Sequence, residues 1–186
     1  MKTKLSILFL LLSLSAFQQV KLVKTKVNDA ITIYLPQDFV AMGEADIETK
    51  YASAKLPVAG YTDFSRTVDL GVNVAYSQWN PEDLEIMRSF YKSNILGLYD
   101  EVQFIKEDVE EIGGYNFAVF EFVSSVNDND GITVDQSPVS KYVRIQYTII
   151  KGKTVLFNFT CPASQREKWA PISRQILESV KISKTL

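Results

Sequence analysis

The stretch GGYNFAVFEFV, residues 113–123, decides how the sheet of this chain is built. Two glycines signal a tight turn, and the strand pattern that follows is apolar in both alternating phases. One phase holds Tyr115, Phe117 and Val119, and the other holds Ala118, Phe120 and Phe122. A strand exposed on one face alternates apolar with polar residues, whereas a strand covered on both faces is apolar throughout. The stretch therefore predicts a central strand covered on both faces.

Further strand patterns lie on either side of this one. Residues 102–109 pair with 115–123 as a hairpin, and YVRIQYTII with TVLFNFTC forms a second hairpin about residues 151–153. Residues 68–77 alternate cleanly and predict a strand with one buried face. A short strand holds Ile31, Ile33 and Leu35 and ends at Pro36.

Three helical patterns accompany the strands. Asn80-Pro81 begins a helix over about 81–98, with an apolar stripe formed by Leu84, Met87, Tyr91, Ile95 and Leu98. Residues 44–54 predict a short helix. The last helix carries Trp169, Ile172, Ile176, Leu177 and Val180 on one face. Ser164 and Glu167 fit a capping box before it, and Pro171 predicts either a kink after a short first turn or a start near Ala170.

The N-terminal residues 1–16 have the composition of a secretory signal peptide. Lys2 and Lys4 precede an apolar run of about 10 residues, against the roughly 20 that a spanning helix needs. We expect cleavage before Phe17, a short extension over 17–29, and a single domain over 30–182. The mature chain is expected to be secreted or periplasmic and not an integral membrane protein.

Composition and net charge limit the classes of binding partner that this chain can be expected to have. The formal net charge is −2 and becomes more negative when Lys2 and Lys4 are removed, which disfavours nucleic acid as the main partner. The single cysteine, Cys161, excludes an internal disulfide. A monomer is expected.

The residues needed for common catalytic sites are missing from the sequence. There is no histidine, which excludes Ser-His-Asp and Cys-His catalysis and histidine-based metal sites. Cys161 shares the apolar phase of its strand with Val155, Phe157 and Phe159, so we expect a buried thiol rather than a nucleophile. The chain is predicted not to be an enzyme, with no catalytic, metal-binding or cofactor-binding residues and no cofactor.

Three weaker patterns remain. NDNDG, residues 127–131, lacks a ligand at the first position of a calcium loop, which Val126 occupies. Glu107, Asp108, Glu110 and Glu111 are more typical of a solvated hairpin tip than of an acid–base pair. Asn158 begins a glycosylation sequon on a predicted strand, where a sequon is a weak signal.

The order of these elements resembles the PsbP/DcrB-like superfamily over about residues 30–182. The resemblance is carried by ITIYLPQDFVAM, YTDFSRTVDLGVNVAY, GGYNFAVFEFV, YVRIQYTIIKGKTVLFNFTCP and WAPISRQILESVKI. It implies an α+β fold in which an antiparallel sheet of about six strands lies between helices, an α/β/α sandwich. It also implies a partner-binding or accessory role, and it carries no catalytic residues over to this chain.

The function expected from the resemblance and the signal peptide is that of a non-enzymatic accessory module that binds an envelope protein. The alternative is a carrier that holds a small apolar ligand between sheet and helix, with Phe117, Phe157, Phe159 and Trp169 as the lining. The loop predicted over Ser124–Pro138 exceeds the usual four to six residues of a connection, so it is a candidate for partner binding, ahead of the acidic residues 107–111.

Overall fold

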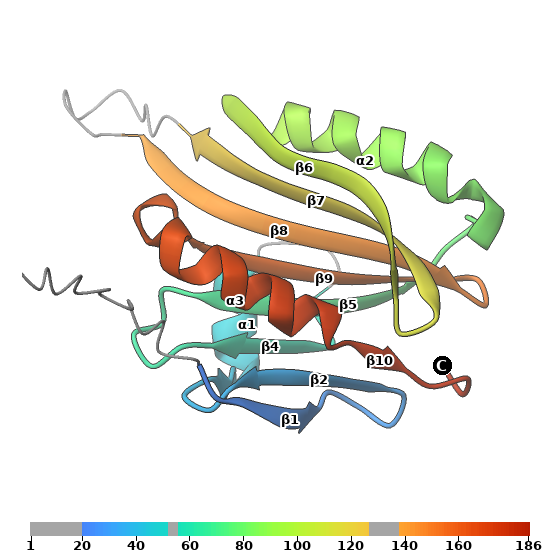
Figure 1. Ribbon diagram of the computed structural model, residues 1–186, viewed down its shortest axis with the longest axis horizontal. Helices are drawn as coiled ribbons and strands as arrows, with labels where there is room; N and C mark the ends of the chain where they lie inside the picture. Colours follow the sequence, from blue (N-terminus) through green and yellow to red (C-terminus); the bar gives the residue numbers. More distant parts are fainter. Residues whose placement is uncertain (1–19, 52–55, 127–137) are drawn as a thin grey trace, which may run out of the picture.

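The computed structural model describes residues 20–51, 56–126 and 138–186. It contains a seven-stranded antiparallel sheet, a separate three-stranded sheet and three α-helices (Figure 1). The expected α+β fold with an antiparallel sheet flanked by helices is therefore confirmed, with seven strands in place of about six.

The large sheet has the strand order β3-β4-β5-β9-β8-β7-β6, with every neighbouring pair antiparallel. Its strands are β3 (Val40–Ala41), β4 (Ala59–Thr62), β5 (Asp69–Tyr76), β6 (Glu101–Ile112), β7 (Tyr115–Val126), β8 (Val139–Ile150) and β9 (Lys153–Pro162). The small sheet has the order β1-β2-β10, formed by β1 (Leu22–Lys26), β2 (Ile31–Pro36) and β10 (Lys181–Ile182). The segment expected as an N-terminal extension thus supplies β1, which pairs with β2.

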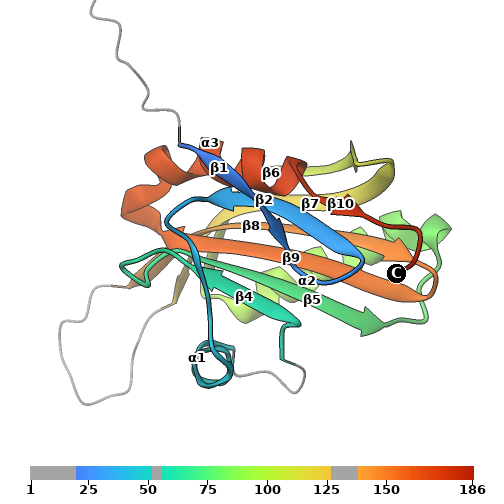
Figure 2. The same ribbon diagram turned by 90° about the horizontal axis from the view of Figure 1, so that it is seen from below.

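The helices lie on opposite faces of the large sheet, as Figure 2 shows for α1 and α3. The face that carries α3 (Arg166–Glu178) and the small sheet is called the α3 face, and the face that carries α1 (Glu44–Lys50) and α2 (Leu84–Leu98) is called the α2 face. Short 3-10 turns, η1 (Pro81–Asp83) and η2 (Ala163–Gln165), precede the two longer helices. None of the helices in the described part of the chain is long and apolar enough to cross a membrane.

Two hydrophobic cores correspond to these two faces. On the α3 face, Phe117, Phe157 and Phe159 pack with Trp169 and with the inner side of β2. On the α2 face, Phe120, Phe122 and Tyr147 pack with Leu84, Met87 and Ile95 of the helix. β7 contributes to both cores, because Phe117 and Phe120 point to opposite faces and are both fully buried. The prediction of an interior strand covered on both faces is confirmed.

The start of α3 differs from the expected start near Ala170 and from the expected capping box. The helix begins at Arg166 and runs through Pro171, and no side-chain hydrogen bond caps its first turn. Ser164 lies in η2, so the expected capping box is not formed. Instead, Trp169 Nε1 donates a hydrogen bond of 3.0 Å to Gln165 Oε1. Pro171 lies inside the helix, where it cannot donate the backbone hydrogen bond that its position would otherwise make.

Candidate functional site

The middle of the large sheet is polar on its α2 face. β9 is the fourth of seven strands, and β5 is its neighbour. On the α3 face these two strands bury Leu70, Val72, Phe157 and Phe159. On the α2 face they carry instead Asp69, Gly71, Asn73, Asn158 and Thr160, interrupted by Leu156. An antiparallel sheet is polar on a face that is open to solvent, and Asn73, Asn158 and Thr160 are partly exposed here, so this strip marks the part of the α2 face that no helix covers.

Helices flank the strip without covering it. α2 packs on β7 and β8, where Tyr91 stacks on Tyr147 with ring centroids 4.2 Å apart. α1 lies over β4 and β5, where Ile47 approaches Gly60 and the ring of Tyr51 lies against Gly71. The strip between the two helices forms the floor of an open groove of about 710 Å³.

We call this feature the polar groove. The described residues that line it are Lys50, Tyr51, Arg66, Thr67, Asp69, Tyr99, Ser124, Val126, Val139, Lys141, Val143, Asn158 and Thr160. Five of these side chains carry hydroxyl groups, one is an amide, and the only aliphatic ones are valines. Its volume lies in the range of about 300–1,000 Å³ that is typical of ligand sites.

Gly71 determines how closely Tyr51 approaches the floor of the groove. A Cβ atom at position 71 would lie 2.9 Å from Tyr51 Oη and 3.1 Å from Tyr51 Cε1. The lack of a side chain thus allows the Tyr51 ring to rest on the sheet beside Asn158, which is the register partner of Gly71 on β9. Burial, together with the charge of Asp69, raises the pKa of Tyr51, so its hydroxyl is neutral and available as both donor and acceptor.

Charges at the rim of the groove are largely paired. Lys50 Nζ lies 2.5 Å from Asp69 Oδ1. Arg66 holds Asp46 through two hydrogen bonds, of 2.8 Å from Nη1 to Oδ1 and of 3.0 Å from Nη2 to Oδ2. On the opposite wall, burial raises the pKa of Tyr99 and a hydrogen bond with Ser124 lowers it, with burial the larger effect. The walls are therefore fixed in place by contacts within the protein.

The floor contains an acceptor without a donor. Within the described part of the chain, Asn158 Oδ1 and Asn73 Oδ1 are buried oxygen atoms that accept no hydrogen bond. The register places the two residues diagonally on neighbouring strands, since Asn158 pairs with Gly71 and Asn73 with Leu156. Buried polar atoms without a partner are uncommon in proteins.

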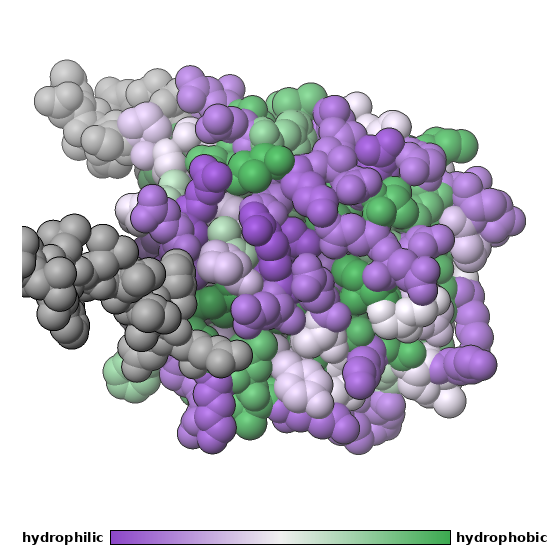
Figure 3. Space-filling model, viewed as in Figure 1, coloured by the Kyte–Doolittle hydropathy of each residue, from purple (hydrophilic) through white to green (hydrophobic). Residues whose placement is uncertain are grey.

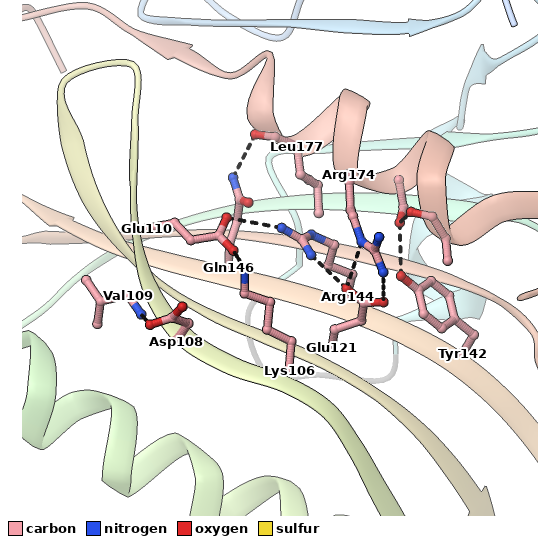
Figure 4. A network of polar contacts seen from close by, with 12 residues as sticks. Lys106, Asp108, Val109, Glu110, Glu121, Tyr142, Arg144, Gln146, Arg174 and Leu177 are labelled. Atoms are coloured by element: carbon pink, nitrogen blue, oxygen red, sulfur yellow. Dashed lines mark hydrogen bonds and ion pairs between the residues drawn. The ribbon is translucent and has the colours of Figure 1, made fainter. Parts of the chain in front are cut away.

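A second polar cluster lies on the α3 face (Figure 4). Arg144 Nη1 donates a hydrogen bond of 2.8 Å to Glu121 Oε2, and Arg174 Nη2 donates one of 2.8 Å to Glu121 Oε1. Arg144 also reaches Glu110, which in turn pairs with Lys106 at 2.5 Å. Glu121 and Arg144 are each 1 % exposed. Burial raises the pKa of Glu121. The hydrogen bond and charge of Arg174 and the charge of Arg144 lower that pKa by more than burial raises it, so the net shift is downward.

This cluster fixes the position of α3 and offers no free acid or base. The Glu121 carboxylate is ionised and occupied by two guanidinium groups. Gln146 Nε2 donates to the Leu177 carbonyl oxygen at 3.0 Å, and Tyr142 Oη lies 3.1 Å from Ser173 Oγ, so polar side chains of β7 and β8 together hold α3 at three points. Figure 3 shows that the face carrying α3 is largely hydrophilic, with small separate apolar patches.

The acidic residues 107–111 do not form a hairpin tip. They lie within β6, and the tip is the turn at Gly113 and Gly114. Glu107 faces α2 and pairs with Arg88 and Lys92. Glu110 faces the other side of the sheet, where it pairs with Arg144 of β8.

The alternation of β6 explains why these carboxylates cannot work together. Residues an odd number of positions apart point to opposite faces of a strand, and Glu107 and Glu110 are three apart. An acid–base pair of these two side chains is therefore not formed. The expectation of a solvated tip is also wrong for both, because their side chains are 22 % and 18 % exposed and each is held in ion pairs.

Cys161 lies where its strand phase predicts. It is 2 % exposed within the core of the α3 face, and burial raises the pKa of its thiol to about 12. The thiol is therefore protonated at neutral pH and is a poor nucleophile.

The remaining expected positions have different outcomes. Residues 127–131, the calcium candidate, lie outside the described residues. The first three residues of the loop predicted over 124–138 belong instead to β7, where Ser124–Val126 pairs with Val139–Lys141 of β8. Asn158 of the sequon lies in the middle of the sheet, where its side chain is part of the groove floor rather than of a surface loop. No group of three or more metal-binding side chains occurs in the described ranges.

The apolar residues expected to line a carrier pocket are packed against one another. Phe117, Phe157 and Phe159 are fully buried and Trp169 is 3 % exposed. Ring centroids are 6.3 Å apart for Phe117 and Phe157, and 5.9 Å apart for Phe159 and Trp169. These side chains fill the space between the sheet and α3.

Sequence reasoning missed both the polar groove and the Glu121 cluster. The available signal for the groove was the polar phase of two interior strands, with Asp69, Gly71 and Asn73 on one and Asn158 and Thr160 on the other. The signal for the cluster was a charged residue inside each of two apolar strands. Neither signal identifies the partners, which come from distant parts of the chain.

Comparison with known proteins supports the architecture. No protein-family model and no curated protein matches the chain. Among solved structures, it is similar to cyanobacterial PsbP (CyanoP) from Synechocystis sp. PCC 6803, with 11 % identity, a TM-score of 0.56, and coverage of 88 % of this chain and 93 % of that one.

Two further solved structures show the same degree of similarity. LpqN of Mycobacterium tuberculosis, described as involved in cell envelope biogenesis, has 13 % identity and a TM-score of 0.56, with coverage of 89 % of this chain and 92 % of LpqN. The Ran-binding protein Mog1p of Saccharomyces cerevisiae has 12 % identity and a TM-score of 0.56, with coverage of 89 % and 97 %. The chain therefore has the PsbP-like fold that its sequence resembles.

Proposed function

We propose that this protein is a non-enzymatic accessory module that acts outside the cytoplasm and binds another component of the cell envelope through the polar groove. The observation that carries the proposal is the polar α2 face of β5 and β9, two interior strands that are apolar on their other face. The side chains of this strip are partly exposed in the groove, where a bound partner can exchange hydrogen bonds with them.

The chemistry of the described side chains supports a binding role over a catalytic one. The sequence contains no histidine. The Cys161 thiol has a raised pKa, and the Glu121 carboxylate is held by two arginines. In the groove, Asp69 is paired with Lys50. These acids and the thiol are poorly placed for proton transfer or nucleophilic attack.

The predicted signal peptide supports a location outside the cytoplasm. The PsbP-like fold is compatible with that location, since LpqN has this fold and is described as involved in envelope biogenesis. The apolar-carrier alternative has less support, because its four expected lining residues fill the core.

A capture experiment tests this function. The chain without residues 1–16 is immobilised and exposed to envelope extract, and the bound proteins and saccharides are both identified. We expect Lys141→Glu, which reverses a charge at the groove, to reduce capture. The matched variant Lys24→Glu changes an exposed lysine of β1, outside the groove, and should capture as well as the unchanged chain. Equal capture by all three proteins would contradict a role for the groove.

A further inference from the structure

The lining of the polar groove indicates the chemical class of its ligand, an inference that rests on the proposed function. The aliphatic lining of the groove is limited to Val126, Val139 and Val143. Six of the thirteen described lining side chains carry a hydroxyl or amide group, and such groups recognise ligands by exchanging hydrogen bonds. A ligand rich in hydroxyl groups fits this lining.

The position of the groove argues against an extended peptide. A peptide that adds to a sheet needs an unpaired strand edge, because its main chain supplies most of the hydrogen bonds. The floor here lies on the face of β5, β9 and β8, which are paired with their neighbours on both sides. Recognition in the groove must therefore come from side chains such as Thr160 and Asn158.

Two tyrosines of the lining indicate a second property of the ligand. Tyr51 rests on the floor above Gly71, and Tyr99 stands on the wall formed after α2. A pyranose ring has a rim of hydroxyl groups and faces of C–H bonds, so it can exchange hydrogen bonds with the floor while it contacts an aromatic ring. Tyrosine suits this task because it combines an apolar ring with a polar hydroxyl.

The charges define the ligand further. Lys50 is paired with Asp69 and Arg66 with Asp46, whereas Lys141 forms no ion pair with any other described residue. Among the described residues, the lining and its paired carboxylates thus comprise three cations, Lys50, Arg66 and Lys141, and two acids, Asp46 and Asp69. One positive charge is in surplus. A ligand with one carboxylate in reach of Lys141 would balance it.

We infer that the polar groove binds a saccharide that carries a carboxylate. The Thr160 hydroxyl and the Asn158 amide contact the sugar hydroxyls, Tyr51 and Tyr99 contact ring faces, and Lys141 contacts the carboxylate. The groove thereby selects acidic over neutral saccharides of the same length.

Titration calorimetry with defined oligosaccharides tests the inference. The probes are a galacturonic acid tetramer, a β-1,4-linked glucose tetramer and, as an acid that is not a sugar, a tetrapeptide with carboxylate side chains. We expect the acidic saccharide to bind most tightly. Lys141→Gln should weaken its binding by about tenfold and remove the preference over the neutral one, because a hydrogen bond to a charged group contributes more than a neutral one.

A pair of conservative variants separates groove contacts from general effects on the sheet. Thr160→Val removes a lining hydroxyl without changing shape and should weaken saccharide binding by about fivefold. Thr154→Val makes the same change on the same strand and face, at a residue that does not line the groove, and should bind as the unchanged chain does. Circular dichroism and melting temperature confirm that each variant is folded.

Three results would overturn the inference. They are binding of neither saccharide at millimolar concentration, tighter binding of the tetrapeptide than of the acidic saccharide, and equal effects of Thr160→Val and Thr154→Val. If no saccharide binds while Lys141→Glu still abolishes capture from envelope extract, the proposed binding function stands and the saccharide assignment fails. If saccharides bind but capture is unaffected by Lys141→Glu, the saccharide assignment stands and the envelope role of the groove fails.

Discussion

Glu121 and Arg144 are register partners on β7 and β8, and Arg144 Nη1 donates a hydrogen bond of 2.8 Å to Glu121 Oε2 in a place where each residue is 1 % exposed. A pair buried this deeply is not a strong source of stability, because desolvation offsets the attraction between the charges. Loss of one partner, however, leaves the other buried and charged. The pair therefore ties the position of β8 to that of β7 and, through Arg174, to α3.

Removal of one member of this pair should destabilise the fold strongly. We expect Arg144→Met to lower the free energy of unfolding by up to about 3–5 kcal/mol, since Glu121 loses its fully buried partner and keeps only Arg174, whose side chain is 47 % exposed. The double variant Glu121→Met, Arg144→Met should be less destabilised than Arg144→Met alone. Urea unfolding measures both. Asp46→Asn serves as the control, because it weakens a surface pair with Arg66 and should lower the free energy of unfolding far less.

Stability should fall in acid because of Glu121. Its pKa is lowered in the folded chain, so its contribution is present above the unfolded value of about 4.3 and is lost as the pH falls through the folded value. We expect the free energy of unfolding to decrease below about pH 4, and Glu121→Gln to show a shallower decrease. Asp63, whose carboxylate accepts hydrogen bonds from the amides of Thr67 and Val68, has a lowered pKa as well and accounts for part of the remaining slope. Parallel pH profiles for the unchanged chain and Glu121→Gln would contradict this assignment.

Cys161 should resist thiol reagents in the native protein. Its thiol is buried and its pKa is raised to about 12, so little thiolate is present at pH 8. We expect labelling by a polar disulfide reagent to be slow in buffer and rapid in denaturant. Cys161→Ala should lower stability by about 1–2 kcal/mol without loss of binding. Fast native labelling would show that the strand phase is wrong.

Gly113 and Gly114 provide a matched pair of turn variants. Both have positive φ, of 60° and 85°, so an alanine at either position is strained by about 1–2 kcal/mol. A Cβ atom at Gly113 would in addition lie 2.8 Å from the carbonyl oxygen of Val180, whereas one at Gly114 meets nothing within 4 Å. We expect Gly113→Ala to be clearly more destabilising than Gly114→Ala in thermal unfolding. Equal melting temperatures would show that the contact with Val180 is absent.

N-terminal sequencing tests whether the chain is exported as expected. Edman sequencing of protein recovered outside the cytoplasm should begin near Phe17, because the apolar run before it is too short to serve as a stable membrane span. Recovery of the intact chain, beginning at Met1, from the cytoplasm would contradict the expectation.

The sequence alone determined where the long strands of the sheet lie and which face their side chains take, but it did not identify β1, β3, β4 or β10. The alternation of side chains is a local property of the backbone, so the two-phase pattern of residues 115–123 identified an interior strand. The same rule placed Cys161 with Phe157 and Phe159 in the core. It also separated Leu70 and Val72 from Asp69 and Gly71 on β5.

Only the tertiary structure decided which strands and helices become neighbours. β5 pairs with β9, about 80 positions later in the chain, and that pairing sets Asn158 beside Gly71 and Tyr51. Likewise, Glu121 meets Arg174 because α3 packs across β8. The sequence pattern marks a polar residue inside an apolar strand, but its partner depends on strand order and helix packing, which are set by contacts between distant segments rather than by local backbone geometry.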